Sequence, residues 1–196
     1  MLWFSRAKSK GEEKMKTFEE KQVYKEERIF VRPVQSRLYS MRDELKRLRE
    51  MPRVIKGNDI KWSAGPQLWG KNMIDPEKGR AQSLFIHFVD LAPHGKSQKH
   101  GHQNEALLYV LEGEGYEIHD GKTYAWNAGD LVLIHGGSVH QHFNADPEKP
   151  ARGIIIKGKP LYMFLNLIYQ EFVEKAPKQP TPGFEDYRPT NLRELL

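Results

Sequence analysis

The sequence predicts an all-β domain with a helical segment on each side of it. Across residues 54–160, short apolar segments alternate with Gly, Pro, Asn and Asp, a pattern typical of strands and turns. On either side of this region, apolar residues recur every three to four positions, as on one face of an amphipathic helix. We therefore expect a charged, partly helical N-terminal extension (1–53), a β-barrel (54–159), and a C-terminal helix with an extended tail (160–196).

The N-terminal extension carries the basic excess of the chain. Residues 1–60 contain 16 Lys and Arg against 10 Asp and Glu, whereas the whole chain has a net charge of +5. Lys and Glu alternate along residues 12–27, which indicates a solvated face, and we expect no nucleic-acid partner. Residues 34–50 predict an amphipathic helix that Pro52 helps to end. Its apolar positions are Leu38, Met41, Leu45 and Leu48.

The central region predicts a series of short strands. They are expected at 83–91, 106–112, 116–119, 122–126, 131–135, 139–144 and 153–157. Asp120-Gly121 predicts a tight hairpin turn between two of them. Short strands at such regular spacing are typical of a barrel or a sandwich.

The C-terminal region predicts a helix that Pro160 opens. Its apolar side is broad and aromatic: Leu161, Phe164, Leu165, Ile168, Tyr169 and Phe172. This side either packs against the outside of the barrel or forms a dimer contact, and both interpretations stay open. We expect a homodimer, and an extended, proline-containing tail from Lys175 onward.

Composition excludes several classes of chemistry and location. The chain has no cysteine, which excludes disulfides, thiolate nucleophiles, zinc fingers and iron–sulfur clusters. No apolar run approaches the length of a membrane span, and the apolar stretch at residues 1–4 is too short for a secretory signal. We therefore expect a soluble, cytoplasmic protein without a membrane partner, in which nitrogen and oxygen ligands hold any transition metal.

Three histidines form the candidate metal site. His100 and His102 are two residues apart, so on a strand their side chains project from the same face. His140 lies on another predicted strand and would complete one side of a metal ion. Such a ligand set leaves other positions on the ion open for substrate or oxygen.

The surrounding residues resemble the cupin family. The first cupin motif has two histidines, usually a glutamate, and a strand ending in glycine; here it corresponds to His100, His102 and 106–113. The second motif, G-x5-P-x-G-x2-H-x3-N, is matched by Gly129, Gly137, His140 and Asn144, with His135 at the proline position. The resemblance covers residues 83–157 and implies a single double-stranded β-helix, or jelly-roll, barrel.

One departure directs the resemblance to a particular group of cupins. Ala106 occupies the position of the usual glutamate, and Glu105 lies one residue earlier, where a strand side chain points to the opposite face. The loss of that carboxylate resembles the gentisate-dioxygenase group, which binds ferrous iron with three histidines. A His-x-His pair, His140 and His142, also resembles that group, although Gln141 stands where the group has Asp and the group has two cupin domains.

The resemblance implies an Fe(II) dioxygenase that acts on a small anionic or hydroxylated aromatic substrate. Three neutral imidazoles leave the ion dipositive, which favours an anionic bidentate substrate. Mn, Ni, Cu or Zn are alternative metals, because imidazole also binds these ions. Two other functions stay open: a non-oxidative lyase, isomerase or decarboxylase, and a small-ligand-binding protein without catalysis.

Further polar residues are candidates for the same site. His142 shares a strand face with His140, and we interpret it either as a catalytic base or donor, or as a hydrogen-bonded interior histidine. His87 is a catalytic candidate if its side chain points into the barrel. Whether Glu105 or Gln98 adds a fourth ligand is left open. His119 lies next to a predicted turn and is expected to be solvated.

Overall fold

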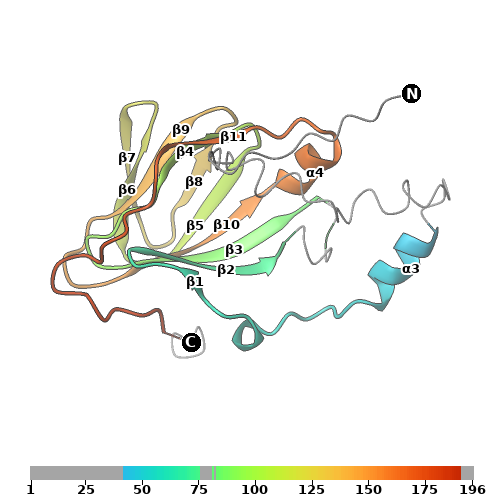
Figure 1. Ribbon diagram of the computed structural model, residues 1–196, viewed down its shortest axis with the longest axis horizontal. Helices are drawn as coiled ribbons and strands as arrows, with labels where there is room; N and C mark the ends of the chain where they lie inside the picture. The colour runs from blue at the N-terminus through green and yellow to red at the C-terminus, as the bar shows by residue number, and fades with distance from the viewer. Residues whose placement is uncertain (1–41, 76–80, 82, 191–196) are drawn as a thin grey trace, which may run out of the picture.

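A computed structural model describes residues 42–75, 81 and 83–190 of the chain. Within them, two antiparallel β-sheets form most of the structure, with few helices (Figure 1). The predicted helix over 34–50 is present as α3 (Arg42–Glu50), and its earlier residues lie outside the described part. Figure 1 shows α3 apart from the two sheets.

The first sheet has six strands, and its order is β1-β2-β3-β10-β5-β8. Its strands are β1 (Ser63–Ala64), β2 (Leu68–Ile74), β3 (Phe85–Leu91), β10 (Ala151–Lys157), β5 (Ala106–Glu112) and β8 (Leu131–Ile134). The second sheet has the order β11-β4-β9-β6-β7. Its strands are β11 (Gln170–Glu174), β4 (Lys99–His102), β9 (Val139–Asn144), β6 (Glu114–His119) and β7 (Lys122–Asn127).

The apolar core lies on the inner face of the six-stranded sheet. Alternate residues of β5 are buried (Ala106, Leu108 and Val110), as the period of two along a strand requires. The core cluster comprises Val89, Leu91, Ala106, Leu108, Val110, Trp126, Ile134, Ala151 and Ile155. Trp126 is contributed by the other sheet, so apolar burial joins the two sheets.

The hairpin prediction is confirmed in detail. Asp120 and Gly121 connect β6 to β7, and both have positive φ angles, +49° and +82°. Positive φ at both central residues is what the primed two-residue turns need, and Asp-Gly adopts it readily. This turn sets the register that pairs Glu117 with Tyr124 and His119 with Lys122.

The prediction of a helix over 160–172 is wrong beyond its first turns. Helix α4 (Lys159–Phe164) has Pro160 in its first turn, and it ends before Asn166, which has a φ of +59°. Asn tolerates this left-handed conformation, which commonly ends helices. The chain then continues as strand β11, so Tyr169 and Phe172 belong to a sheet region and not to a helix.

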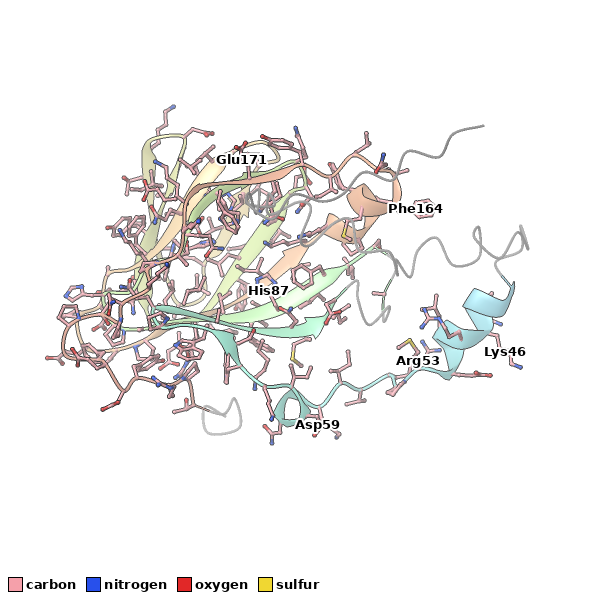
Figure 2. All side chains as sticks on the ribbon, in the orientation of Figure 1. Lys46, Arg53, Asp59, His87, Phe164 and Glu171 are labelled. Atoms are coloured by element: carbon pink, nitrogen blue, oxygen red, sulfur yellow. The ribbon has the colours of Figure 1, made fainter. Side chains whose placement is uncertain are left out.

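Because the helix ends early, the apolar side chains predicted to share one helix face separate into a buried set and an exposed set. Met163 and Ile168 are buried with Tyr162 packed against them, whereas Phe164 projects outward from α4 (Figure 2). The other exposed apolar side chains here are Leu161, Leu165, Leu167 and Tyr169. Of the predicted apolar side, Ile168 is buried in this small cluster, and packing against the barrel and the dimer contact both stay predictions. None of the described helices is long and apolar enough to cross a membrane.

Candidate metal centre

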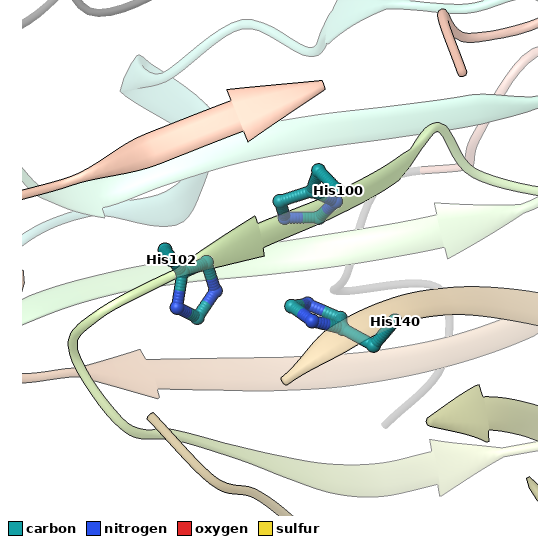
Figure 3. A group of neighbouring side chains, drawn as sticks. All are labelled: His100, His102 and His140. Carbon is teal, nitrogen blue, oxygen red and sulfur yellow. The ribbon is translucent and has the colours of Figure 1, made fainter. Parts of the chain in front are cut away.

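Two neighbouring strands bring the three predicted ligands together. His100 and His102 lie on β4, and His140 on β9 is the direct cross-strand partner of His100. The potential ligand atoms of the three side chains all lie within 4.8 Å of one another. Figure 3 shows the three rings turned toward a common centre. The centroid of the His140 ring lies 4.4 Å from that of His100 and 4.9 Å from that of His102.

Backbone carbonyls orient the three imidazoles. Nδ1 of His102 contacts the carbonyl oxygen of Asn104 at 2.7 Å, and Nδ1 of His140 contacts that of Ser138 at 3.1 Å. The corresponding contact of His100, to the carbonyl of Gln98, is longer at 3.5 Å. A carbonyl can only accept, so Nδ1 carries the proton and Nε2 keeps its lone pair.

The same arrangement leaves a buried nitrogen without a hydrogen-bond partner. His102 is 2% exposed, and its Nε2 is buried with no partner in the structure. An unpartnered buried polar atom is uncommon, because it loses its interaction with water without compensation. A metal ion between the three rings would satisfy it, so the residues present fit a divalent ion.

Burial keeps the three histidines neutral. Desolvation lowers the pKa of His102 to about 3 and that of His140 to about 2, and it holds the pKa of His100 well below its usual range. The positive charge of Lys157 acts in the same direction on all three. A neutral imidazole is the form that binds metal, so the group is ready to bind without first losing protons.

No carboxylate belongs to this histidine group in the described part of the chain. Ala106 is buried on the inner face of β5, whereas Glu105 is exposed on the other side, as strand alternation predicts. Gln98 is half-buried, and its backbone carbonyl, described above, supports His100. The geometry thus groups three histidines and leaves Glu105 outside.

A buried carboxylate next to this group was missed by the sequence analysis. Glu117 on β6 is 0% exposed, and its two oxygens lie 2.7 Å from Nδ1 of His142 and 2.6 Å from Nε2 of His119. Strand β6 pairs with β9, which places Glu117 opposite His142 and His119 opposite His140. The period of two along 114–119 put Glu117 and His119 on one face, but only the pairing with β9 shows that this face is interior.

The outcomes for the other histidines follow from this arrangement. His142 is a hydrogen-bonded interior histidine in the structure, and its catalytic role stays a prediction. His119 is buried, so the expectation that it is solvated is wrong: its cross-strand pairing with His140 turns it inward. His87 lies on β3 within the body of the molecule (Figure 2), and its Nδ1 is buried without a partner. Its catalytic role likewise stays a prediction.

Gln141 supports the position of His142. It follows His140 on β9, so its side chain points away from the three-histidine group. Its Nε2 donates to the carbonyl of Ser97 at 2.8 Å, and the Ser97 hydroxyl accepts from the backbone N–H of His142 at 2.9 Å. Ser97 is fully buried, so these bonds tie β9 to the segment preceding β4.

Comparison with known proteins agrees with the histidine motifs. Residues 87–157 match the family model described as Cupin domain. A 5-aminosalicylate 1,2-dioxygenase from Comamonas sp is 27% identical over 107 residues, which cover 54% of this chain and 28% of that enzyme. The chain therefore spans less than a third of the length of this relative.

Solved structures show the same fold in distant proteins. A salicylate 1,2-dioxygenase from Pseudaminobacter salicylatoxidans matches with a TM-score of 0.51 and 15% identity, over 57% of this chain and 32% of that one. A salicylate 1,2-dioxygenase from Pseudoaminobacter salicylatoxidans, solved as an adduct with gentisate, matches with a TM-score of 0.51 and 14% identity. The match covers 67% of this chain and 36% of that one. Over residues 87–157 the chain therefore resembles a cupin domain, and its similarity extends to the gentisate- and salicylate-dioxygenase group of cupins.

Proposed function

We propose that this protein is an Fe(II)-dependent dioxygenase that acts on small hydroxylated aromatic or other enolisable carboxylic acids. The observation that carries the proposal is the group of three buried, neutral histidines without a carboxylate. The similarity of the chain to a 5-aminosalicylate 1,2-dioxygenase supports the same reaction class. His100, His102 and His140 would hold the ion, and iron bound there would supply the redox chemistry with dioxygen.

The ligand set favours an anionic substrate. Neutral ligands leave the full charge of a divalent ion in a buried site, where electrostatic attraction is stronger than in water. A substrate with adjacent carboxylate and hydroxyl oxygens could balance that charge. Glu117 is a nearby negative group, but both of its oxygens are engaged by His119 and His142.

His142 is suited to accept a proton from the substrate. Because Glu117 accepts a hydrogen bond from Nδ1, the lone pair of His142 is on Nε2, and the carboxylate would stabilise the ring once protonated. Removal of the phenol or enol proton would strengthen the substrate as an anionic ligand. We propose this as the role of His142, with Glu117 positioning the ring.

The test is oxygen consumption by protein loaded anaerobically with Fe(II). The panel contains gentisate, salicylate, 5-aminosalicylate and small enolisable acids. We expect substrate-dependent uptake that His102→Ala abolishes together with bound iron, because a histidine ligand is lost. His135→Ala is the matched control, since His135 is exposed and outside the histidine group. Full iron occupancy in His102→Ala would contradict the ligand assignment, and turnover without oxygen would favour a lyase or isomerase.

A further inference from the structure

Lys157 places an ammonium group on the inner side of the barrel. It is the last residue of β10, where it pairs with Phe85 on β3 and with Ala106 on β5. Directly paired residues in a sheet point to the same face. Ala106, the partner of Lys157, is buried in the core. Ile155 lies two residues before Lys157 on the same face of β10 and is also buried in the core, so this face is the interior.

The charge of this lysine acts on the three-histidine group across the interior. Its positive charge lowers the pKa values of His100, His102 and His140, and also that of His87. These histidines lie on the opposite sheet, apart from His87, which is on β3. Lys157 therefore faces the candidate metal centre from the other side of the interior.

Lys157 has no counter-ion in the described part of the chain. No hydrogen bond or ion pair involves its Nζ there, although the neighbouring Lys159 donates to Gln170 Oε1 at 2.9 Å. Glu117 is engaged by two histidines, and Asp90 by Arg152 and Tyr187. Burial and the charge of Lys159 lower the pKa of Lys157 to about 7. Lys157 is only partly exposed, and an unpaired ammonium with reduced hydration is costly, so an anion bound beside it would offset that cost.

His87 and Phe85 complete a surface beside this ammonium group. The His87 and Phe85 rings are stacked with centroids 4.8 Å apart and an interplanar angle of 24°. Burial holds the pKa of His87 well below its usual range, and its Nδ1 has no partner. A neutral imidazole can donate one hydrogen bond to a carboxylate without adding charge, and an aromatic side chain such as Phe85 can pack against an aromatic ring.

We propose that Lys157 binds the carboxylate of an aromatic acid, with His87 as a second polar contact, and so positions the substrate against the three histidines. The inference rests on the proposed function in that the bound acid is the substrate. It narrows the substrate class to acids in which one carboxylate oxygen can contact Lys157 while the other and the adjacent hydroxyl face the three histidines. Lys157 is thereby a determinant of specificity for acids over their uncharged amides.

The experiment compares binding of salicylate and salicylamide by the zinc-loaded and the metal-free protein, followed by calorimetry. These ligands differ in charge at one group and are similar in shape. We expect the wild type to bind salicylate about tenfold or more tightly than salicylamide, and Lys157→Met to lose that preference while binding salicylamide unchanged. Lys149→Met, at an exposed loop position, is the matched control.

Each outcome decides the proposal. Lys157→Gln is the second variant, so that a packing defect of methionine is recognised, and thermal unfolding establishes that both variants are folded. Unchanged salicylate affinity in both variants would overturn the proposal, as would equal affinity of the wild type for acid and amide, or no binding of salicylate at about 10 mM. Because binding needs neither iron nor oxygen, failure of oxygen uptake with intact Lys157-dependent binding would refute only the proposed reaction.

Discussion

Replacement of Glu117 by Gln is the sharpest test of the buried network beside the histidine group. The carboxylate accepts from two imidazoles at 2.6 and 2.7 Å and is completely buried. Gln has the same shape, but its one oxygen can accept from only one of the two rings. Its NH2 group must then face a ring nitrogen that donates to Glu117 in the wild type.

The magnitude follows from the pKa of this carboxyl. Interactions with His142 and His119 outweigh the opposing effect of burial and lower the pKa of Glu117 from 4.5 to about 2. At about 1.4 kcal/mol for each unit, the ionised carboxylate stabilises the folded state by about 3 kcal/mol at pH 7. Because the folded pKa is the lower one, this stabilisation is present above pH 4.5 and is lost as the pH falls toward 2.

The assay is urea denaturation of the metal-free proteins between pH 7 and pH 3. We expect Glu117→Gln to be less stable than the wild type by about 3 kcal/mol at pH 7 and by about half as much at pH 3. Glu114→Gln is the control, because Glu114 lies on the same strand with an exposed side chain. A stability difference that does not change with pH would refute the argument that ionisation of Glu117 stabilises the fold.

Three further substitutions test the remainder of the fold by denaturant unfolding. Arg152→Met leaves the buried Asp90 without its 2.6 Å ion pair and should cost about 3–5 kcal/mol, and a neutral effect would mean that the pair is replaceable by packing. Asn144→Ala removes the donor shared by the carbonyls of Leu91, Ala92 and Lys149; we expect a loss of about 1–3 kcal/mol, and wild-type stability would show that water replaces it. Gly115→Ala places a Cβ 2.2 Å from the Phe143 carbonyl oxygen and 2.5 Å from the Trp126 ring. It should therefore lower the free energy of unfolding by at least about 1–3 kcal/mol. An unchanged denaturation midpoint would contradict the tight packing of β6 on β7 and β9.

The sequence predicted those features that depend on neighbouring residues, namely strands, a turn and the pairing of His100 with His102 on one face. Short segments bounded by turn residues predicted strands at 106–112 and 139–144 that coincide with β5 and β9, and Asp120-Gly121 predicted its turn. His100 and His102 were predictable as a pair because strand parity places them on one face. Approach of His140 to them depends on the pairing of β4 with β9, which the resemblance to the cupin motifs supplied.

The features that the sequence did not predict depend on pairing between strands that are distant in the chain. Glu117 and His119 became interior residues because β6 lies next to β9, and no short pattern contains that information. Strand β11 was predicted as helix because its apolar residues continue the helical spacing of α4. The left-handed conformation at Asn166 interrupts that helix, and pairing with β4 then favours an extended chain. Tertiary contacts thus override local propensity at this segment.

Strand β11 determines when the edge of β4 becomes covered during synthesis of the chain. It covers the outer edge of β4, and Gln170, its first residue, follows His102 by 68 positions. During translation, β4 can pair with β9 while its other edge still carries unsatisfied backbone groups. The histidine-bearing strand therefore passes through a stage in which it is the open edge of a sheet. Strand β11 emerges later than β4 and β9 and ends that exposure, so it protects the strand that carries two of the proposed ligands, His100 and His102.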